Sequence, residues 1–220
     1  MINLINWSWK SSLKTTGKLM NYILIALIWT GYCALHSYMI SIRFTNLMMH
    51  ILKRYYAFYR LFYVLISIVL LFPVLHYTSR LASEVIIHYD PPWSIIRYAL
   101  LIFSMLIFLR VFLFDYDSLA FFGIRQILNF RKKTVNNEGG IKKGGLLGIV
   151  RHPMYFATIL FLWCQTYRLS DIVVNVVLTA YVIIGTILEE KKLVLEFGDS
   201  YVQYQQEVPM LIPFTKIKPS

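Results

Sequence analysis

The stretch GIVRHPMYFATILF, residues 148–161, places an arginine, a histidine and a proline at the start of an apolar run, with Tyr155 following closely. Pro153 suits the first position of a helix, where no backbone N–H is needed. A helix N-terminus carries partial positive charge and free N–H groups, so it can hold an anion, and Arg151 and His152 add donors there. These residue types predict a polar binding site at the mouth of a membrane-length segment.

An acidic pair, Glu189 and Glu190, closes the next apolar run. Negative charge at this position opposes the dipole of a helix C-terminus, and acidic residues do not serve as membrane anchors as basic residues do. If the two runs form a hairpin, the pair lies across from His152 and offers acceptors to an ammonium group or to ribose hydroxyls. S-adenosylmethionine is a ligand of this kind, although the same geometry admits other polar ligands.

The elements that hold these residues are apolar helices. The chain has 220 residues, of which 58% are hydrophobic and 15% charged, and its mean hydropathy is +0.58, which is more apolar than a soluble domain of this length. A spanning helix needs about 20 apolar residues. Five runs are candidates, at about residues 20–42, 57–77, 94–114, 153–169 and 171–188. We therefore predict a single all-α integral membrane domain over residues 1–220, with about five transmembrane helices.

The last two runs are short and closely joined, which predicts a tight helical hairpin with Ser170 or Asp171 as the N-cap of its second arm. Residues 115–150 form a predicted loop that contains GGIKKGG, and residues 189–220 form a tail. Within the tail the spacing predicts one amphipathic helix over residues 189–206. Its apolar face consists of Leu193, Phe197, Tyr201 and Tyr204, and Pro209 and Pro213 follow it.

The formal net charge of +11 is compatible with binding to nucleic acid or to an anionic membrane surface. The long apolar runs favour the membrane. Lysines and arginines are in excess in the loops on one side, which predicts a cytoplasmic C-terminus and an active site that faces the cytoplasm of a plasma, inner or ER membrane. Lys10, Lys14 and Lys18 oppose this orientation unless residues 1–18 lie in the interface. No cleavable signal peptide pattern precedes the first run, and Cys33 and Cys164 lie inside apolar runs, which argues against a disulfide framework.

Further ionisable residues lie near the same predicted helix ends, at His36, Arg60 and Arg110. Such residues inside a membrane usually face the bundle interior, and they are candidates for function. The simpler explanations are an arginine that reaches the headgroups and a histidine that bonds to a neighbouring helix. In a catalytic role, His36 and Arg110 would supply the base or the positive field that favours a thiolate.

The pattern RHPMY, then a short hairpin, then EEKKLVLEFGDSYVQYQQEVPMLIP resembles the membrane methyltransferases related to isoprenylcysteine carboxyl methyltransferase and phospholipid methyltransferase. This resemblance covers roughly residues 144–214. In the first half, ALHSYMISIRF, RYYAFYRLFYVLISIVLLFPV and FLFDYDSLAFFGIRQI are similar to the methanethiol S-methyltransferase and NnrU-like branch. Two positions depart from the pattern, because Ala157 stands where many members have glycine and residues 145–147 read Gly-Leu-Leu.

The resemblance implies an S-adenosyl-L-methionine-dependent membrane methyltransferase whose cofactor-binding core is residues 144–214. It implies cofactor contacts from His152 and Glu190, with Tyr155 and Glu189 beside them and Arg151 at the same helix start, and no metal. The tail would fold back over the cofactor. The implied methyl acceptor is a small thiol or an apolar, lipid-like molecule that enters from the lipid bilayer.

Four alternatives stay open. A carboxylate acceptor, as in isoprenylcysteine-type O-methylation, needs a cation, and after the fifth run only lysines remain, so Arg60 or Arg110 would have to supply it. A sterol-reductase-like enzyme carries RHPNYxGE, from which this chain departs at Met154 and at residues 157–158. The third alternative is a non-catalytic NnrU-like membrane protein. The fourth is a haem protein with His36 and His152 as axial ligands.

Overall fold

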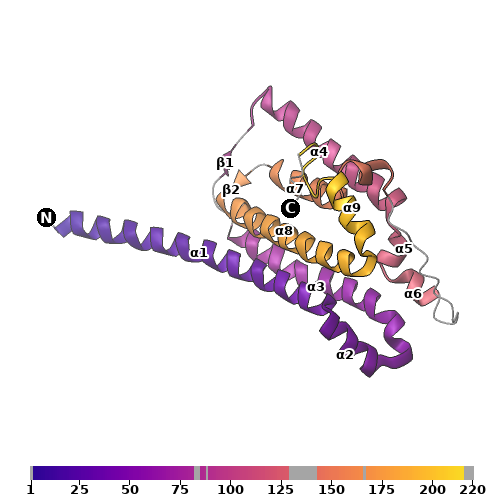
Figure 1. Cartoon of the computed structure of the whole chain (residues 1–220). Helices are drawn as coiled ribbons and strands as arrows, with labels where there is room; N and C mark the ends of the chain where they lie inside the picture. The colour runs from indigo at the N-terminus through magenta and orange to yellow at the C-terminus, as the bar shows by residue number, and fades with distance from the viewer. Residues whose placement is uncertain (1, 82–84, 88, 129–142, 166, 216–220) are drawn as a thin grey trace.

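The computed structural model describes residues 2–81, 85–87, 89–128, 143–165 and 167–215, with side chains from residue 17 onward except those of Ile87 and Tyr167. The described chain is almost wholly helical (Figure 1). It opens with α1 (Ile2–Ile40), whose N-terminal half projects away from the other helices. The predicted all-α fold is confirmed.

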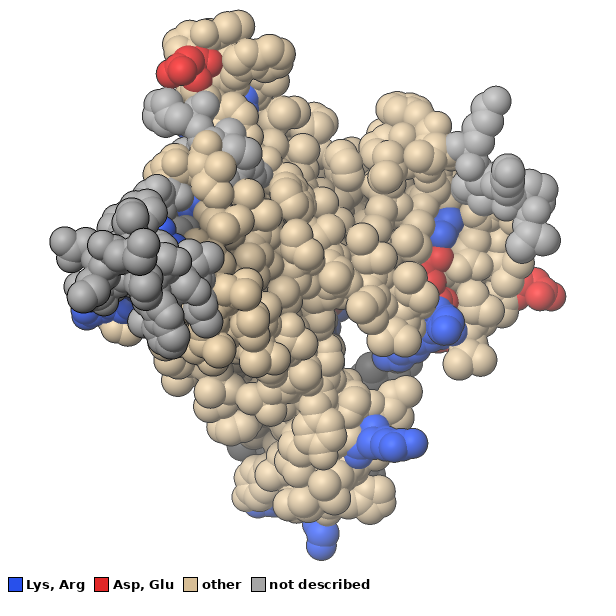
Figure 2. All heavy atoms as spheres, turned by 90° about the vertical axis from the view of Figure 1, so that its left-hand side faces the viewer, with Lys and Arg blue, Asp and Glu red and all other residues tan. Residues whose placement is uncertain are grey.

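Four helical stretches are long and apolar enough to cross a membrane, namely Gly17–Ile40, Ile42–Arg80, Trp93–Asp115 and Leu169–Phe197. The chain is therefore a multi-pass membrane protein by length and composition. Its wide surface of uncharged side chains, with lysines, arginines and acidic residues confined to a few places, is visible in Figure 2. A surface of this kind suits contact with lipid tails, which offer no partners to polar groups.

The elements follow one another along the chain in a simple order. After α1 come α2 (Ile42–Leu52), a 3-10 turn (Lys53–Phe58), α3 (Tyr59–Arg80), β1 (Val85–Ile87), α4 (Trp93–Arg110), a π-helical turn (Val111–Asp115), α5 (Ser118–Phe121), α6 (Ile124–Leu128), a second 3-10 turn (Gly145–Gly148), α7 (Pro153–Trp163), β2 (Tyr167–Arg168), α8 (Leu169–Phe197) and α9 (Asp199–Glu207). The strands β1 and β2 pair antiparallel. Helix α1 packs on α3 and α8, whereas α7 packs on α4 and α8.

The predicted fourth span, residues 153–169, is wrong in length. Helix α7 has 11 residues, which at 1.5 Å per residue extend about 16 Å, or roughly half of the hydrocarbon core of a bilayer. It ends at Trp163, with Cys164 as the C-cap, because the chain then forms the short strand β2 with β1. The hairpin that α7 makes with α8 is nevertheless present, and Asn175 Nδ2 donates to the Leu162 carbonyl across it at 2.9 Å.

Two predictions about the ends of α8 are also wrong. Its N-cap is Arg168, and Asp171 stabilises this end from inside the helix by accepting the Arg168 N–H at 2.9 Å. Its C-terminal end at Phe197 divides the tail, because Gly198 has φ +59°, a left-handed conformation that favours glycine. The tail is therefore the end of α8 plus α9, and not one helix over residues 189–206.

The apolar face predicted for the tail is nevertheless present. Tyr201, Tyr204 and Val208 form a buried cluster, and Leu193, Val194 and Phe197 pack against it. The bend at Gly198 brings α9 back toward α8 and keeps the two parts of the face together. This folded-back segment covers the start of α7 (Figure 1).

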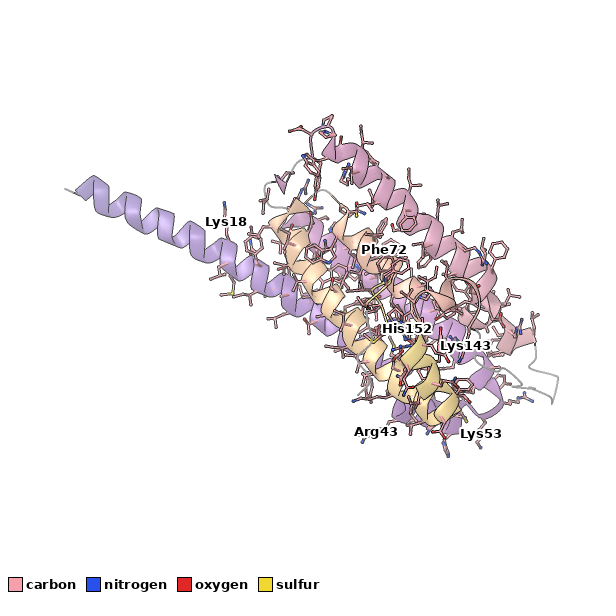
Figure 3. The ribbon with its side chains drawn as sticks, turned by 45° about the horizontal axis from the view of Figure 1, so that its top comes forward. Lys18, Arg43, Lys53, Phe72, Lys143 and His152 are labelled. Atoms are coloured by element: carbon pink, nitrogen blue, oxygen red, sulfur yellow. The ribbon has the colours of Figure 1, made fainter. Side chains whose placement is uncertain are left out.

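The ends of α1 and α8 and the start of α3 lie at one end of the bundle, whereas β1 and β2 lie at the other (Figure 1). Arg43, Lys53 and Lys143 lie at the first end with His152, while Lys18 lies on the projecting part of α1 (Figure 3). These four residues thus lie at one end of the bundle, and the cytoplasmic orientation of this end stays a prediction. The side chains of residues 1–16 and residues 139–142 of GGIKKGG are outside the described residues.

Candidate functional site

The carboxylate of Glu190 is the centre of a buried hydrogen-bond network, and the residue is only 6% exposed. Its Oε1 accepts from Arg151 Nε at 2.7 Å, His152 Nε2 at 2.9 Å and the Tyr201 hydroxyl at 2.9 Å. Its Oε2 accepts from Arg151 Nη2 at 2.6 Å and Gln205 Nε2 at 2.7 Å. A buried carboxylate is tolerated only when it is paired in this way. Glu190 therefore joins α7, α8 and α9 at one point.

Arg151 extends the same network to the segment after α9, residues 208–211. Its Nη1 donates to the carbonyls of Gln205, at 2.9 Å, and of Val208. The backbone N–H groups of Arg151 and His152 donate to the carbonyls of Pro209, at 2.9 Å, and Met210, at 3.1 Å. The donors predicted to hold an anion at the start of α7 are thus largely satisfied by the protein's own C-terminal segment.

The second acidic residue, Glu189, faces a different set of groups, and its partly exposed carboxylate can accept further hydrogen bonds. Its Oε2 accepts from the Tyr155 hydroxyl at 2.7 Å, and its side chain is 35% exposed. His152 Nδ1 lies 4.0 Å from the same oxygen. This nitrogen is buried and has no hydrogen-bond partner among the described residues. Because His152 Nε2 faces Glu190, a neutral ring donates there and presents Nδ1 as an acceptor.

The ring of His152 is fixed in place by stacking on Tyr155, with ring centroids 5.5 Å apart and planes inclined by 14°. Tyr155 is on α7 and Glu189 is on α8, so the contact between them also joins the two arms of the hairpin. His152 Nδ1 and the Glu189 carboxylate form what we call the acceptor pair. It suits a ligand that donates hydrogen bonds or carries positive charge.

Tyr116 is a further residue near Glu189, and the sequence analysis does not identify it. It follows the π-helical turn at the end of α4 and lies close enough to Glu189 and Tyr204 to interact with both electrostatically. Burial, with a smaller contribution from the Glu189 charge, raises the pKa of Tyr116 to about 12. One tyrosine among 16 carries no signal in the sequence. The nearby motif FDYD marks only the end of a span.

His36 belongs to another cluster, between α1, α3 and α8. Its Nε2 lies 2.6 Å from the Tyr63 hydroxyl, and its ring is 6.3 Å from that of Tyr181. Ser37 donates to the Tyr181 hydroxyl at 3.1 Å. The histidine is therefore bonded to a neighbouring helix, and the structure does not bring it into the Glu190 network.

Arg110 is partnered at the edge of the bundle. Its Nη1 lies 3.4 Å from Asp115 Oδ1, its guanidinium lies 4.6 Å from the centroid of the Phe114 ring, and its side chain is 47% exposed. Arg60 Nε donates to the Phe121 carbonyl at 3.0 Å. Among the described residues, Arg110 is thus paired with Asp115 rather than placed beside His36.

An open groove of about 530 Å³ adjoins the Glu190 network, which is within the size range of small-molecule sites, about 300–1,000 Å³. Its walls come from the second half of α8, from α9 and from the segment after α9. The lining residues are Ile187, Glu190, Lys191, Val194, Leu195, Gln205 and Met210. The groove is mostly apolar and shares the Glu190 side chain with the buried network.

The fold and the buried network define a multi-pass helical membrane protein whose C-terminal segment closes over a paired arginine, histidine and glutamate. A family model described as "Protein of unknown function (DUF1295)" matches residues 37–205. The chain belongs to this family. No solved structure matches it.

Curated relatives support the resemblance inferred from the motifs. The methanethiol S-methyltransferase of Pseudomonas deceptionensis is 36% identical over 115 residues, which cover 52% of this chain and 43% of the relative. That of Pseudomonas sp. (strain GM41(2012)) is 35% identical over 109 residues, 49% of this chain and 41% of the relative. That of Mycobacterium tuberculosis (strain ATCC 25618 / H37Rv) is 26% identical over 102 residues, which cover 46% of this chain and 42% of the relative. The chain thus spans less than half the length of these relatives, and the predicted resemblance to this branch is confirmed.

Proposed function

We propose that this chain is a membrane methyltransferase that moves a methyl group from S-adenosyl-L-methionine to a small thiol. The relatives' names supply the reaction and the acceptor class. The observation that carries the proposal for this chain is the acceptor pair, in which a buried His152 Nδ1 has no hydrogen-bond partner in the described part of the chain and lies 4.0 Å from a Glu189 oxygen.

The donor set of the cofactor suits the acceptor pair. S-adenosyl-L-methionine has an ammonium group and two ribose hydroxyls, all of which donate hydrogen bonds, and both members of the pair accept them. In the proposal, His152, Glu189 and Tyr155 hold the cofactor within residues 144–214, and Tyr116 lies beside them. When bound, the cofactor supplies an electrophilic methyl group.

Glu190 and Arg151 have a supporting role in this proposal. Their side chains are hydrogen-bonded to each other and to α9, and Glu190 also binds His152. In this proposal they therefore fix the position of His152 and do not contact the ligand. Methyl transfer requires alignment and a desolvated nucleophile more than acid–base chemistry. A rigid network under a folded-back C-terminal segment supports both requirements.

The pairing of Arg60, Arg110 and Arg151 favours a thiol over a carboxylate acceptor. A carboxylate is best held by a free guanidinium. Arg151 is bound to Glu190, Arg110 to Asp115, and Arg60 to a backbone carbonyl. A neutral thiol needs no such partner. We place the polar end of the bundle in the cytoplasm, because the lysines and arginines of the loops are in excess there.

Calorimetry of the detergent-purified protein with S-adenosyl-L-methionine tests the proposal. We expect binding by the wild type and a loss of at least about tenfold, roughly 1.4 kcal/mol, in His152→Ala and in Glu189→Gln. Glu207→Gln is the matched control, since Glu207 pairs with Lys143 at 3.0 Å on the outside of α9. Folded wild-type protein that does not bind the cofactor would overturn the proposal, as would equal binding by all three variants.

A further inference from the structure

The open groove beside the Glu190 network lies where α8 leaves the bilayer. Helix α8 has 29 residues, which at 1.5 Å per residue extend about 44 Å, whereas the hydrocarbon core of a bilayer is about 30 Å thick. Its last turns therefore reach the headgroup layer. The groove is lined by α8 residues from Ile187 to Leu195, so it lies at the depth where lipid headgroups meet the first carbons of their chains.

The apolar wall of the groove continues along one side of α8 into the spanning part of the helix. Ile184 and Leu188 are 58% and 60% exposed, and Ile187, which lines the groove, is 42% exposed. At the far end, Leu195 lines the groove and is 88% exposed. These residues and Lys191 recur every three to four positions, so they share one side of the helix. The groove is thus continuous with a surface that faces lipid tails.

Lys191 carries the uncompensated charge of the groove. Two of the lining residues are charged, Glu190 and Lys191. Glu190 is buried and paired with Arg151 at 2.6 Å, so its negative charge is already balanced. Lys191 is exposed, and its amino group has no partner in the part of the chain that the structure describes. Because Arg43 and Lys53 lie at the same end of the bundle (Figure 3), this end attracts anionic headgroups.

The groove faces away from the acceptor pair. Along α8, Glu189 is two residues from both Ile187 and Lys191, and two residues turn a helix by about 200°. Glu189 therefore lies on roughly the opposite side of α8 from the groove. On the helix, Glu190 separates the two sides, and both of its oxygens are bonded to Arg151. A molecule in the groove is thus separated from the proposed cofactor site.

We propose that the groove binds one anionic phospholipid of the surrounding bilayer. An acyl chain lies against Ile187, Val194 and Met210, and the phosphate pairs with Lys191. This inference goes beyond the proposed function and does not depend on it. The groove has walls from α8, from α9, which lies alongside the end of α8 (Figure 1), and from the segment after α9. The lipid contacts all three and so stabilises the folded-back C-terminal segment.

The competing explanation is that the whole basic end attracts anionic lipids without a specific site. Lys192 provides the matched control for this explanation. It follows Lys191 directly and is also exposed, but it points about 100° away on the helix and does not line the groove. Lys191→Gln and Lys192→Gln therefore remove the same charge from the same end of the bundle, and only the first removes it from the groove.

The test titrates the detergent-purified protein with phosphatidylglycerol and with phosphatidylcholine of the same chain length. Native mass spectrometry measures the affinity of the first bound lipid. We expect the wild type to prefer phosphatidylglycerol. Lys191→Gln should weaken binding of phosphatidylglycerol by about fivefold, the effect of one lysine beside an anionic headgroup, and should leave phosphatidylcholine unchanged. Lys192→Gln should bind both lipids as the wild type does.

A second pair of variants tests the place of the acyl chain. Ile187→Trp puts an indole into the groove and should weaken both lipids by about tenfold. Ile184→Trp adds the same volume one turn earlier, outside the groove, and should weaken neither. Glycerol 3-phosphate, which has the phosphate without the chains, should not displace phosphatidylglycerol at equal concentration.

Three results would contradict the inference. Equal effects of Lys191→Gln and Lys192→Gln would assign lipid binding to the basic end as a whole. Displacement by glycerol 3-phosphate would make the ligand a free phosphate. Equal effects of the two tryptophan variants would remove the acyl chain from the groove. Folded wild-type protein that binds phosphatidylglycerol through Lys191 but does not bind S-adenosyl-L-methionine would overturn the proposed function and support this inference.

Discussion

Arg151 and Glu190 form a two-pronged ion pair, with Nε–Oε1 and Nη2–Oε2 distances of 2.7 and 2.6 Å, and both side chains are less than one tenth exposed. The planar guanidinium matches the carboxylate at both oxygens, which lysine cannot do. Because the same arginine also binds carbonyls of the C-terminal segment, the pair helps to hold that segment in place.

Removing one partner of this pair should destabilise the protein strongly. Glu190→Leu leaves a buried unpaired guanidinium, and Arg151→Met leaves a buried unpaired carboxylate, each at a cost of about 3–5 kcal/mol. The double variant Arg151→Met/Glu190→Leu should lose less than the sum of the two, since no unpaired charge remains. Thermal unfolding in detergent measures the stability of the wild type, the two single variants and the double variant. Additive losses would show that the two side chains do not act as a pair.

Two tyrosine hydroxyls in the site should differ in effect. Tyr201→Phe removes a bond to the buried Glu190 carboxylate, so we expect a loss of stability of about 1.5–3 kcal/mol. Tyr155→Phe frees the partly exposed Glu189, so we expect weaker cofactor binding and a smaller change in stability. Unfolding and calorimetry on both variants make the comparison. The reverse pattern would contradict the separation of the two glutamates into a structural and a ligand-facing residue.

Gly123 should not tolerate a side chain. It has φ +81°, and a Cβ added there would lie 2.8 Å from the Leu61 backbone nitrogen and 2.9 Å from Arg60 Cβ. We expect Gly123→Ala to destabilise the protein by more than about 1 kcal/mol, since neither backbone can move cheaply. Gly185 has nothing within 4 Å of the same position. Gly185→Ala, in the interior of α8, should be neutral or stabilising by up to about 1 kcal/mol in the same unfolding assay.

The closure of α9 should weaken in alkali. Burial raises the pKa of Tyr204 to about 12, from an ordinary value near 10. The folded state therefore keeps the proton longer than the unfolded chain does. The stabilisation is complete below pH 10 and is lost between about pH 10 and pH 12.

Tyr204→Phe removes this group and should flatten the fall in unfolding temperature over that pH range. Tyr55→Phe is the control, since Tyr55 is exposed. An unchanged alkaline profile in Tyr204→Phe would assign the loss to another group, and Tyr116, whose pKa is also raised to about 12, would then be the next variant to measure.

The sequence predicts most of the helices, because apolar runs of bilayer length permit little else. It also predicts that Arg151 and His152 meet the acidic pair. It does not reveal which glutamate faces inward, since neighbouring residues on a helix point about 100° apart and both carry the same charge. Glu190 faces Arg151, and Glu189 faces Tyr155. The half-length of α7 is equally hidden, because it depends on the pairing of β2 with the distant β1.

The surroundings of the catalytic candidates are the part of the site that the sequence predicts least well. His36 and Arg110 are both placed near helix ends by the sequence, but only a three-dimensional structure shows that one bonds to Tyr63 and the other to Asp115. Tyr63, Tyr116 and Tyr181 carry no signal among 16 tyrosines. Tyr63 and Tyr181 meet His36 where α1, α3 and α8 pack together, whereas Tyr116 lies near Glu189 after the π-helical turn.

The partners of Arg151 also set an order of events during biosynthesis. The arginine emerges 39 residues before Glu190 and 54 residues before Gln205, whose carbonyl it also binds. Until those residues have been made, Arg151 lacks the partners that it has in the folded protein. The side-chain contacts that fix the start of α7 therefore form only once the segment up to Val208 has been synthesised.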